Sequence, residues 1–565
     1  MRITAIPQIY RHVNRWGEIL SVLSKYGLAN WVGRLGPDFA KDMFRGPGGA
    51  AIARLPWETR IRLALAELGP TFIKLGQVLS TRPDLIGVTL ADELTLLQTA
   101  VPADPPDVVR RTILQELGRP VEELFDDFDD VPLASASIGQ VHRARLKSGE
   151  PVAVKVQRAD IQRKVAVDTD ILNGLAQLAE SRLPEFENYR PRAIAEEFQR
   201  TTQRELDFQR ELRHMQQFAQ DFAGDSTLCI PRPYPELSTA RVLTMQYLEG
   251  IKLSDAAALT AAGYDLGELA RRGARIYLEM IFSHGFYHAD PHPGNVLVMD
   301  GGVFGLLDHG MVGRMDERLH DNVEEFLLAV TSLDAEHLTS IIVRLGSVPQ
   351  DLDRAGLSVD VSDFVSHYGT QRLEDLDLSG ALREMVEMVR RYHIYLPARV
   401  AMLIKTLVTL EGTARLLSPH FSLLEIMRPY RRKMILRRLS PTRRLRRFQR
   451  LYSDISHMAE VLPQGIVDIV EQMRDGVFDV HLDHRGLEPS VNRLVLGMLA
   501  SALIVGSSLL MAQEVPPSFR GVSLSGVLGF AMAFFLGIRL LRAINKSGHL
   551  DRRAEIQARK KPPAR

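Results

Sequence analysis

Cysteine is almost absent from this sequence, with Cys229 alone among 565 residues. One cysteine cannot form an internal disulfide framework or a cysteine-rich zinc site, and it suits a reducing compartment. An excess of one charge is also lacking, because 70 lysines and arginines face 69 aspartates and glutamates. A general nucleic-acid binder would carry a basic excess, so we expect no nucleic-acid partner. The N-terminus has no apolar run with a small-residue cleavage site, which excludes a typical secretory signal.

The chain is long and rich in apolar residues. A chain of 565 residues, 45% of them hydrophobic, can build a large core and more than one folding unit. We expect an N-terminal helical extension, a catalytic body in two parts, a basic helical segment, two membrane helices and a basic tail. The expected bounds are 1–120, then 121–250 and 251–420 for the two parts of the body, then 421–490, 491–545 and 546–565.

Two uncharged apolar runs lie near the C-terminus, Leu494–Ala512 with 19 residues and Val522–Ile538 with 17. These lengths fall in the lower part of the range that crosses a ~30 Å hydrocarbon core, so we predict a helical hairpin in the membrane. Basic residues flank the pair at Arg493, Arg539, Arg542, Lys546, Arg552 and Arg553. The positive-inside rule then places both ends and the catalytic body on the cytoplasmic side of the inner membrane. The alternative is two buried helices of a soluble domain.

A basic run precedes the hairpin, with eleven lysines or arginines and no acidic residue between positions 428 and 450. Such a run, with apolar residues interleaved, is typical of a segment that binds an anionic lipid surface. RNA binding is the competing interpretation, but the neighbouring hairpin already provides such a surface.

Small residues recur every fourth position in the second apolar run, at Gly529, Ala533 and Gly537. This seam lets two helices approach closely in lipid. It can pack within one hairpin or between two chains, and we favour the second, a homodimer through the transmembrane helices.

The segment "ELGPTFIKLGQVLSTRPDLI" begins a helix at Gly69 and Pro70 and ends it before Pro83. Lys74 and Gln77 lie three residues apart, on a face away from the apolar stripe. Such a polar pair is usually a solvated surface, and a functional role is the alternative.

The catalytic body opens with two predicted strands, Ile138–Arg145 and Pro151–Gln157, joined by "LKSGE". The period of two places Lys155 opposite a face of three valines. A small-residue loop followed by a hairpin with such a lysine is how protein kinases hold ATP, and a surface lysine is the alternative. The usual G-x-G-x-x-G is missing, and "ASASIG" stands in its place.

A helical stretch covers residues 192–220, where Asp207 and Glu211 share a face and Glu205 points elsewhere. Either Glu211 or Asp207 would therefore pair with Lys155, as a helix acid does in kinases. The following "ARVLTMQYLEG" has the form of a connector between lobes. We expect its backbone groups to line an adenine site at Met245, Gln246, Tyr247 and Leu248.

The most specific signal is "HADPHPGNVLVMDGGVFGLLDHG". Its prolines exclude helix, so Asp290 and Asn295 lie on a loop, and two strands joined by "DGG" follow. Antiparallel pairing brings Asn295 beside Asp308, and such oxygen ligands suit Mg²⁺ held together with phosphate. Asp290 has the place of a catalytic-loop carboxylate.

The histidines of this stretch offer a rival interpretation, a transition-metal hydrolase site. It would use His284, His288, His292 and His309. It leaves the upstream lysine hairpin and the acidic helix unexplained.

Six motifs in order, "KLGQ", "LASASIGQVH", "VAVKVQ", "ELDFQREL", "HADPHPGN" and "LLDHG", resemble the UbiB, aarF and ADCK family of atypical kinases. The resemblance spans residues 60–410, and the hairpin is similar to that of bacterial UbiB proteins. It implies an α+β, atypical protein-kinase-like bilobal fold with an N-terminal helical K-x-G-Q extension and a C-terminal transmembrane helical hairpin.

The resemblance also implies roles for single residues. Lys74 and Gln77 would belong to a regulatory K-x-G-Q motif, and Glu205 and Asp207 to an E-x-D pair. Lys155 would bind ATP with Glu211 as its partner, Asp290 would be catalytic, and Asn295 and Asp308 would bind metal. The nucleotide loop would comprise Leu133, Ala134, Ser135, Ala136, Ser137, Ile138, Gly139, Gln140 and Val141. His309 departs from the family, where many members have phenylalanine.

The activity implied by the resemblance is an ATP- and Mg²⁺-dependent kinase-like ATPase that supports ubiquinone (isoprenoid quinone) biosynthesis at the membrane. ATP or ADP and Mg²⁺ are the implied cofactors. Anionic membrane lipids and quinone precursors, or the enzymes that process them, are the implied partners. A true kinase acting on a protein or small-molecule hydroxyl and a non-catalytic nucleotide-sensing scaffold are the alternatives.

Overall fold

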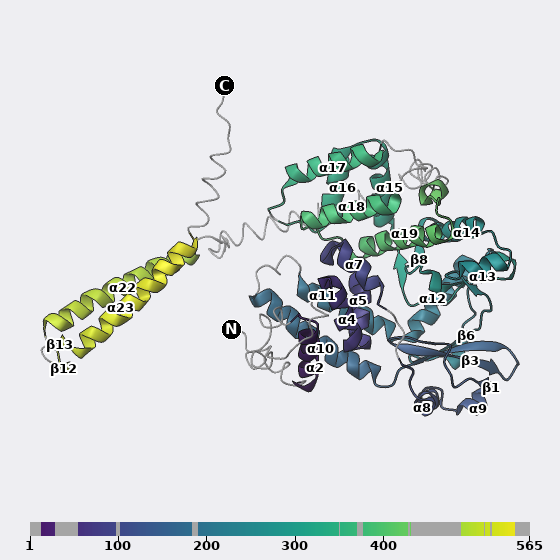
Figure 1. Ribbon diagram of the computed structural model, residues 1–565, viewed down its shortest axis with the longest axis horizontal. Helices are drawn as coiled ribbons and strands as arrows, with labels where there is room; N and C mark the ends of the chain where they lie inside the picture. Colours follow the sequence, from purple (N-terminus) through teal and green to yellow (C-terminus); the bar gives the residue numbers. More distant parts are fainter. Residues whose placement is uncertain are drawn as a thin grey trace, which may run out of the picture. The chain divides into compact units, whose positions relative to one another are not determined.

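The structure is a computed structural model of the chain (Figure 1). It describes residues 13–28, 55–97, 102–182, 190–349, 351–369, 377–427, 430, 488–513, 515–519 and 522–547. These form two compact units, Met1–Arg443 and Arg444–Arg565, each considered by itself below. Apart from residue 430, the predicted basic run at 428–450 lies outside the described residues, as does the tail from 548.

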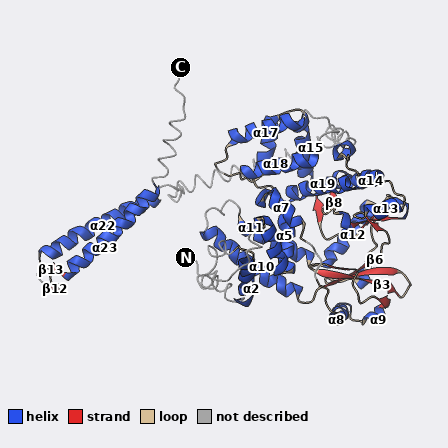
Figure 2. Ribbon diagram, viewed as in Figure 1, coloured by secondary structure: helices blue, strands red, loops and turns tan. Residues whose placement is uncertain are grey.

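A five-stranded antiparallel sheet forms the first lobe of unit 1 (Figure 2). Its strands are β1 (Phe125–Phe128), β2 (Ala134–Ser135), β3 (Gly139–Leu146), β4 (Pro151–Gln157) and β6 (Val242–Gln246). The order is β1-β3-β4-β6, and β2 pairs with β3. Both predicted strands of the lysine hairpin are confirmed, the first shifted by one residue.

Strand β4 shows why the lysine hairpin folds as predicted. Val152, Val154 and Val156 are at most 1% exposed, packed in the core that α8 (Pro106–Leu117) and α9 (Val121–Leu124) cover. Ala153 packs on the other face, against α12 (Phe208–Asp221). The alternation therefore directs Lys155 toward α12.

The predicted continuous helix at 192–220 is wrong at its centre. Helix α11 (Pro191–Glu205) ends before Asp207, and α12 begins after it. Asp207 is the N-cap of α12, since its carboxylate accepts a hydrogen bond from Gln209 N at 3.1 Å. An aspartate competes for backbone donors in this way, which favours a helix start over a helix interior.

The second lobe is mainly helical and holds the largest core of unit 1. Its helices are α13 (Ala256–Ala261), α14 (Leu266–Glu279), α15 (Glu317–Thr331), α16 (Ala335–Leu345), α17 (Arg354–Gly369), α18 (Leu378–Arg391) and α19 (Ala398–Leu417). Its short strands are β5 (Leu228–Cys229), β7 (Ile251–Lys252), β8 (Phe286–His288), β9 (Val296–Met299), β10 (Val303–Leu306) and β11 (Val312–Arg314). β9 and β10 are the predicted hairpin around "DGG", confirmed with Val296 opposite Leu306.

An N-terminal helical extension forms part of unit 1 and has a core of its own. It comprises α2 (Val13–Lys25), α4 (Trp57–Leu68), α5 (Pro70–Ser80), α6 (Pro83–Ile86) and α7 (Val88–Thr95), and α10 (Ile161–Arg182) adds Ile171 to its core. The predicted start of α5 at Gly69 and Pro70 is confirmed. Arg82 fastens the extension, because it pairs with Glu197 of α11 at 2.9 Å and donates to the Leu396 carbonyl at 3.1 Å.

Unit 2 consists of two long helices, α22 (Glu488–Ala512) and α23 (Leu524–Ser547), joined through β12 (Ser518–Phe519) and β13 (Val522–Ser523). Among the described residues, α22 alone is long and apolar enough to cross a membrane, over Leu494–Ala512. The apolar part of α23, Leu524–Leu540, is shorter. Length and composition thus support one of the two predicted membrane crossings.

The small-residue seam of α23 faces α22 of the same chain. A Cβ added to Gly529 would lie 2.1 Å from Ser507 Oγ, whereas one added to Gly537 would meet nothing within 4 Å. Ala533 is 3% exposed. At Gly529 the seam therefore packs within the hairpin, because Ser507 fills the space there. The homodimer through the transmembrane helices stays a prediction.

Gly529→Leu is expected to separate α22 from α23, because the leucine side chain would occupy the position of Ser507 Oγ. Cysteines at Gly497 and Leu540 report the packing, since a Cβ on Gly497 lies 3.8 Å from Leu540 Cδ2. We expect the yield of the disulfide to fall several-fold with Gly529→Leu and to stay unchanged with Gly537→Leu, the matched control. Equal yields in all three proteins would contradict this packing.

Candidate active site

Lys155 is the centre of the charged cluster between the lobes. Its Nζ lies 2.7 Å from Glu211 Oε2 and 3.0 Å from Glu211 Oε1. Asp308 Oδ1 lies 3.8 Å away on the other side. Of the two predicted helix partners, Glu211 is therefore the one that pairs, and Asp207 does not, because it caps α12 and lies 3.6 Å from Arg213.

The cluster shifts the titration of its members. Burial opposes the charge on Lys155, but the carboxylates of Asp308 and Glu211 outweigh it and raise the pKa of Lys155. The Lys155 ammonium in turn lowers the pKa of Asp308 well below its usual range, against the effect of burial. The Asp308 side chain is 53% exposed and that of Glu211 is 5% exposed. Glu211 thus pairs with the lysine on its buried side, whereas the Asp308 carboxylate is accessible from solvent.

The loop before β9 carries the other predicted carboxylate, Asp290. Asn295 Nδ2 donates to Asp290 Oδ2 at 2.8 Å, and the Asn295 carbonyl accepts from Leu307 N at 3.0 Å. The second bond continues the β9–β10 ladder and sets Asn295 beside Asp308, as predicted. Asn295 and Asp308 carry oxygen atoms of the kind that Mg²⁺ prefers, so the residues present fit this ion.

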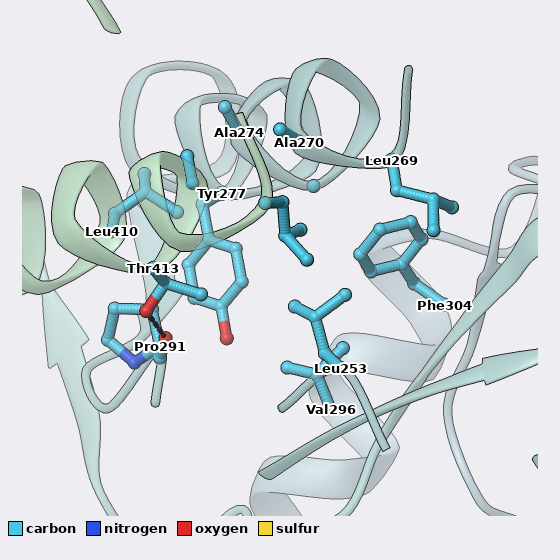
Figure 3. Close-up of a pocket in the computed structure, with 13 residues that line it drawn as sticks. Leu253, Leu269, Ala270, Ala274, Tyr277, Pro291, Val296, Phe304, Leu410 and Thr413 are labelled. Carbon is cyan, nitrogen blue, oxygen red and sulfur yellow. Dashed lines mark hydrogen bonds between the residues drawn. The ribbon is translucent and has the colours of Figure 1, made fainter. Parts of the chain in front are cut away.

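Helix α19 supports the loop from behind. Thr406 Oγ1 donates to the Ala289 carbonyl at 3.2 Å, and Thr413 Oγ1 donates to the Pro291 carbonyl at 3.0 Å. Two hydroxyls thus hold the residues on either side of Asp290. Figure 3 shows the second bond at the edge of a narrow apolar cavity of about 20 Å³, into which Tyr277 points. A cavity of this size holds about one water, so we do not assign it a substrate.

His288 links the two acidic segments. Its Nδ1 accepts from Asp290 N at 3.3 Å, which leaves Nε2 to donate to the Asp308 carbonyl. His309 is fully buried, with its ring 5.6 Å from that of Phe218, and burial lowers its pKa to about 3. The ring is therefore neutral and packs as an aromatic side chain. In this way the D-x-G loop accommodates a histidine where many family members have phenylalanine.

The rival histidine site is not supported. Among the described residues, one group of side chains has ligand atoms close enough to hold a metal, namely His320, Asp321 and Glu324 on α15. It includes none of the four histidines of the rival interpretation. His309 is enclosed, and both ring nitrogens of His288 are engaged.

The predicted nucleotide loop is a tight hairpin. Ala134 pairs with Val141 and Ser135 with Gln140, and Ala136 N donates to the Gly139 carbonyl at 2.8 Å. Gly139 has no room for a side chain, since a Cβ would lie 2.8 Å from the Val156 carbonyl oxygen. This contact explains why glycine stands at the start of β3.

Arg158 holds this loop in place, and no sequence pattern indicated this role. The guanidinium donates to the Ala136 carbonyl at 2.8 Å and to Ser135 Oγ at 2.6 Å. It also pairs with Asp104 at 2.8 Å. Asp104 N donates to Gln140 Oε1 at 2.7 Å, which ties the segment before α8 to β3.

The connector at Met245–Leu248 fits the prediction in part. Gln246 N donates to the Arg232 carbonyl at 2.8 Å, and Tyr247 N donates to the Pro151 carbonyl at 3.1 Å. These two N–H groups are therefore engaged within the chain and are not available to a base. If the backbone of this connector binds an adenine base, the groups that do so are others than the N–H groups of Gln246 and Tyr247.

Lys74 of the extension reaches the same region. It is 8% exposed and pairs with Glu205 at 2.5 Å, so it does not lie on a solvated face. Glu205 and Asp207 have separate partners, as predicted, but the reason is that α11 ends at Glu205 and Asp207 caps α12. Gln77 lies on α5, partly exposed, three residues after Lys74. Lys405 of α19, which no motif indicated, contacts the end of the same helix, because its Nζ donates to Ser80 Oγ at 3.4 Å.

Comparisons with known proteins agree with this geometry. Three family descriptions match the chain: "ABC1 atypical kinase-like domain" at residues 96–342, "UbiB helical domain" at 361–422, and "ABC1/UbiB kinase-like C-terminal domain" at 481–546. A "Probable protein kinase UbiB" of Azotobacter vinelandii is 33% identical over 82% of this chain and 85% of its own length. One from Shewanella piezotolerans is 32% identical over 80% and 84%.

Two further similarities carry less information on activity. An uncharacterised protein of Clostridium pasteurianum is 31% identical over 87% of this chain and 93% of its own length. A Mycobacterium tuberculosis protein solved as an erythromycin complex is 21% identical, with a TM-score of 0.40 over 62% of this chain and 90% of its own. The motifs, the lysine-centred cluster and the full-length relatives agree, and this chain belongs to the ABC1/UbiB family of atypical kinase-like proteins.

Proposed function

We propose that this protein binds Mg–ATP between the lobes of unit 1 and acts as a kinase-like ATPase that supports ubiquinone, or another isoprenoid quinone, biosynthesis at the membrane. The observation that carries the proposal is the position of Lys155 between Glu211 and Asp308, beside the bonded pair Asp290 and Asn295. These are the groups that phosphoryl transfer requires in kinases.

Each residue has a role in this proposal. Lys155, oriented by Glu211, binds the α- and β-phosphates, and the hairpin at 133–141 covers them. Asp308 and Asn295 would hold Mg²⁺, which neutralises developing phosphate charge when bound. Asp290, held by Asn295, accepts the proton of a water or of a substrate hydroxyl. Transfer to a hydroxyl is the second candidate, since the same aspartate serves both acceptors.

The location and the pathway rest on other observations. Helix α22 offers a membrane span, and α23 packs on it through Gly529, so we propose that the pair enters the membrane as a hairpin with unit 1 in the cytoplasm. Anionic lipid is the proposed contact of the basic run. The relatives named "Probable protein kinase UbiB" support a role in quinone biosynthesis. Quinone precursors, or the enzymes that process them, are the partners that we propose for this role.

Asp290→Asn is expected to lower kcat for Mg–ATP hydrolysis about 100-fold, because general-base catalysis contributes at least that factor. Phosphate release by the purified full-length protein is the measurement. Asp300→Asn, an exposed acid in the β9–β10 turn, is the matched control and should keep full activity. If both variants match the wild type, Asp290 is not the base.

The same variant tests the pathway. Quinone intermediates are quantified in a strain that lacks this protein, where an early precursor is expected to accumulate. Wild-type protein restores the quinone and Asp290→Asn does not. Restoration by Asp290→Asn would favour the nucleotide-sensing scaffold, and transfer of labelled phosphate to a hydroxyl would favour the true kinase.

A further inference from the structure

Lys405 brings a third lysine to the active site. Its Nζ donates to Ser80 Oγ, at the end of α5, at 3.4 Å. The next residue, Thr406, bonds to the carbonyl of Ala289, immediately before Asp290. Lys405 therefore lies where α19 meets both the helix of Lys74 and the catalytic loop.

The three lysines differ in how their charge is balanced. Lys155 has Glu211 at 2.7 Å and Lys74 has Glu205 at 2.5 Å. In the described part of the chain, Lys405 Nζ forms no ion pair within 4.0 Å, and a neutral hydroxyl is its hydrogen-bond partner. Burial lowers the pKa of Lys405, the Asp290 carboxylate opposes this effect, and the Lys74 ammonium adds to it.

An ammonium in this situation gains from an anion. Lys405 is partly buried, and partial burial without a paired charge is unfavourable. A phosphate oxygen would supply the missing partner. The position beside Asp290 is where the transferred group must lie, because Asp290 acts on the acceptor that attacks it. In phosphoryl transfer, charge is spread over the oxygens of the terminal phosphate, and a cation there stabilises it.

We propose that Lys405 binds the terminal phosphate of the nucleoside triphosphate and makes the site distinguish triphosphate from diphosphate. The inference rests on the proposed function, in which Lys155 binds the α- and β-phosphates. Lys405 of α19 would then contact the terminal phosphate, which ATP has and ADP lacks. Ser80 then releases the ammonium when the triphosphate binds.

Lys405→Met tests this assignment by equilibrium binding to the full-length protein. The probes are a non-hydrolysable β,γ-imido analogue of ATP and ADP, each with Mg²⁺. A hydrogen bond to a charged group contributes about 1.5–3 kcal/mol, so the Kd for the analogue is expected to rise roughly 10- to 100-fold. The Kd for ADP is expected to change less than about threefold. Lys405→Arg, which keeps the charge, is expected to retain most of the preference.

Two controls separate this role from a structural one. Ser80→Ala removes the hydroxyl partner and leaves the charge, and Arg399→Met removes a charge from an exposed position on the same helix, 2.7 Å from Asp316. Both are expected to keep the triphosphate preference. If Ser80→Ala reproduces Lys405→Met, or if Lys405→Met weakens both nucleotides equally or neither, Lys405 does not read the terminal phosphate. Wild-type protein that binds neither nucleotide would overturn the proposed function itself.

Discussion

Asp308→Asn is expected to reduce Mg–ATP turnover about 1000-fold and to weaken Mg²⁺-dependent nucleotide binding. The carboxylate is the exposed member of the Lys155 cluster, and its removal takes a negative charge from the proposed metal ligands. A metal ion contributes several kcal/mol of charge stabilisation, and about 1.4 kcal/mol corresponds to a factor of ten. Titration of nucleotide affinity against Mg²⁺ concentration is the measurement.

The asparagine side chain keeps the shape of Asp308 and its bond from Gly310 N, which is 2.9 Å in the wild type. The loop is therefore expected to fold, and the variant reports the charge. Asp316→Asn is the matched control, an aspartate that is 50% exposed and pairs with Arg399 at 2.7 Å. Nucleotide affinity that does not depend on Mg²⁺, and is the same in Asp308→Asn, would remove Asp308 from the metal site.

Lys155→Met is expected to abolish measurable turnover and to destabilise unit 1 by about 3–5 kcal/mol at pH 7. The loss of one partner from a buried ion pair leaves the other charge uncompensated, and Glu211 retains only the N–H of His309 at 3.3 Å. Burial already raises the pKa of Glu211, and without the lysine it rises further. The folded variant then binds a proton that the unfolded chain does not, so its deficit shrinks as the pH falls toward 5.

Thermal melting of the full-length protein at pH 7 and at pH 5.5 measures this effect. The double variant Lys155→Met with Glu211→Met is expected to recover much of the melting temperature and none of the activity, because both charges are gone. A single variant that melts like the wild type at pH 7 would show that the pair adds little to stability. A double variant that hydrolyses ATP would exclude Lys155 from nucleotide binding.

Sequence patterns predicted the parts of this site that local geometry decides. The period of two along β4 set the direction of Lys155, and the "DGG" turn set the pairing that puts Asn295 beside Asp308. Both depend on residues within a few positions of one another. The choice between Asp207 and Glu211 was left open, since a side-chain cap on α12 decides it and helical spacing does not show a cap.

Contacts between distant segments escaped prediction. Lys405 and Ser80 are 325 residues apart, and Arg158 reaches Asp104 across 54. No spacing rule connects such pairs, because tertiary packing alone brings them together. Helical periodicity likewise defines the face of α23 that carries Gly529 and does not say which helix covers that face.

The Arg158 fastening has a thermodynamic consequence for ligand binding. A loop that closes over phosphates usually loses conformational freedom at that moment, and part of the interaction energy offsets this loss. Here the guanidinium of Arg158, which follows directly on strand β4, already holds Ser135 and Ala136. The loop and the strand that carries Lys155 are therefore linked before a nucleotide binds. Nucleotide association is therefore expected to show a small entropic penalty in calorimetry, and Arg158→Met is expected to enlarge it.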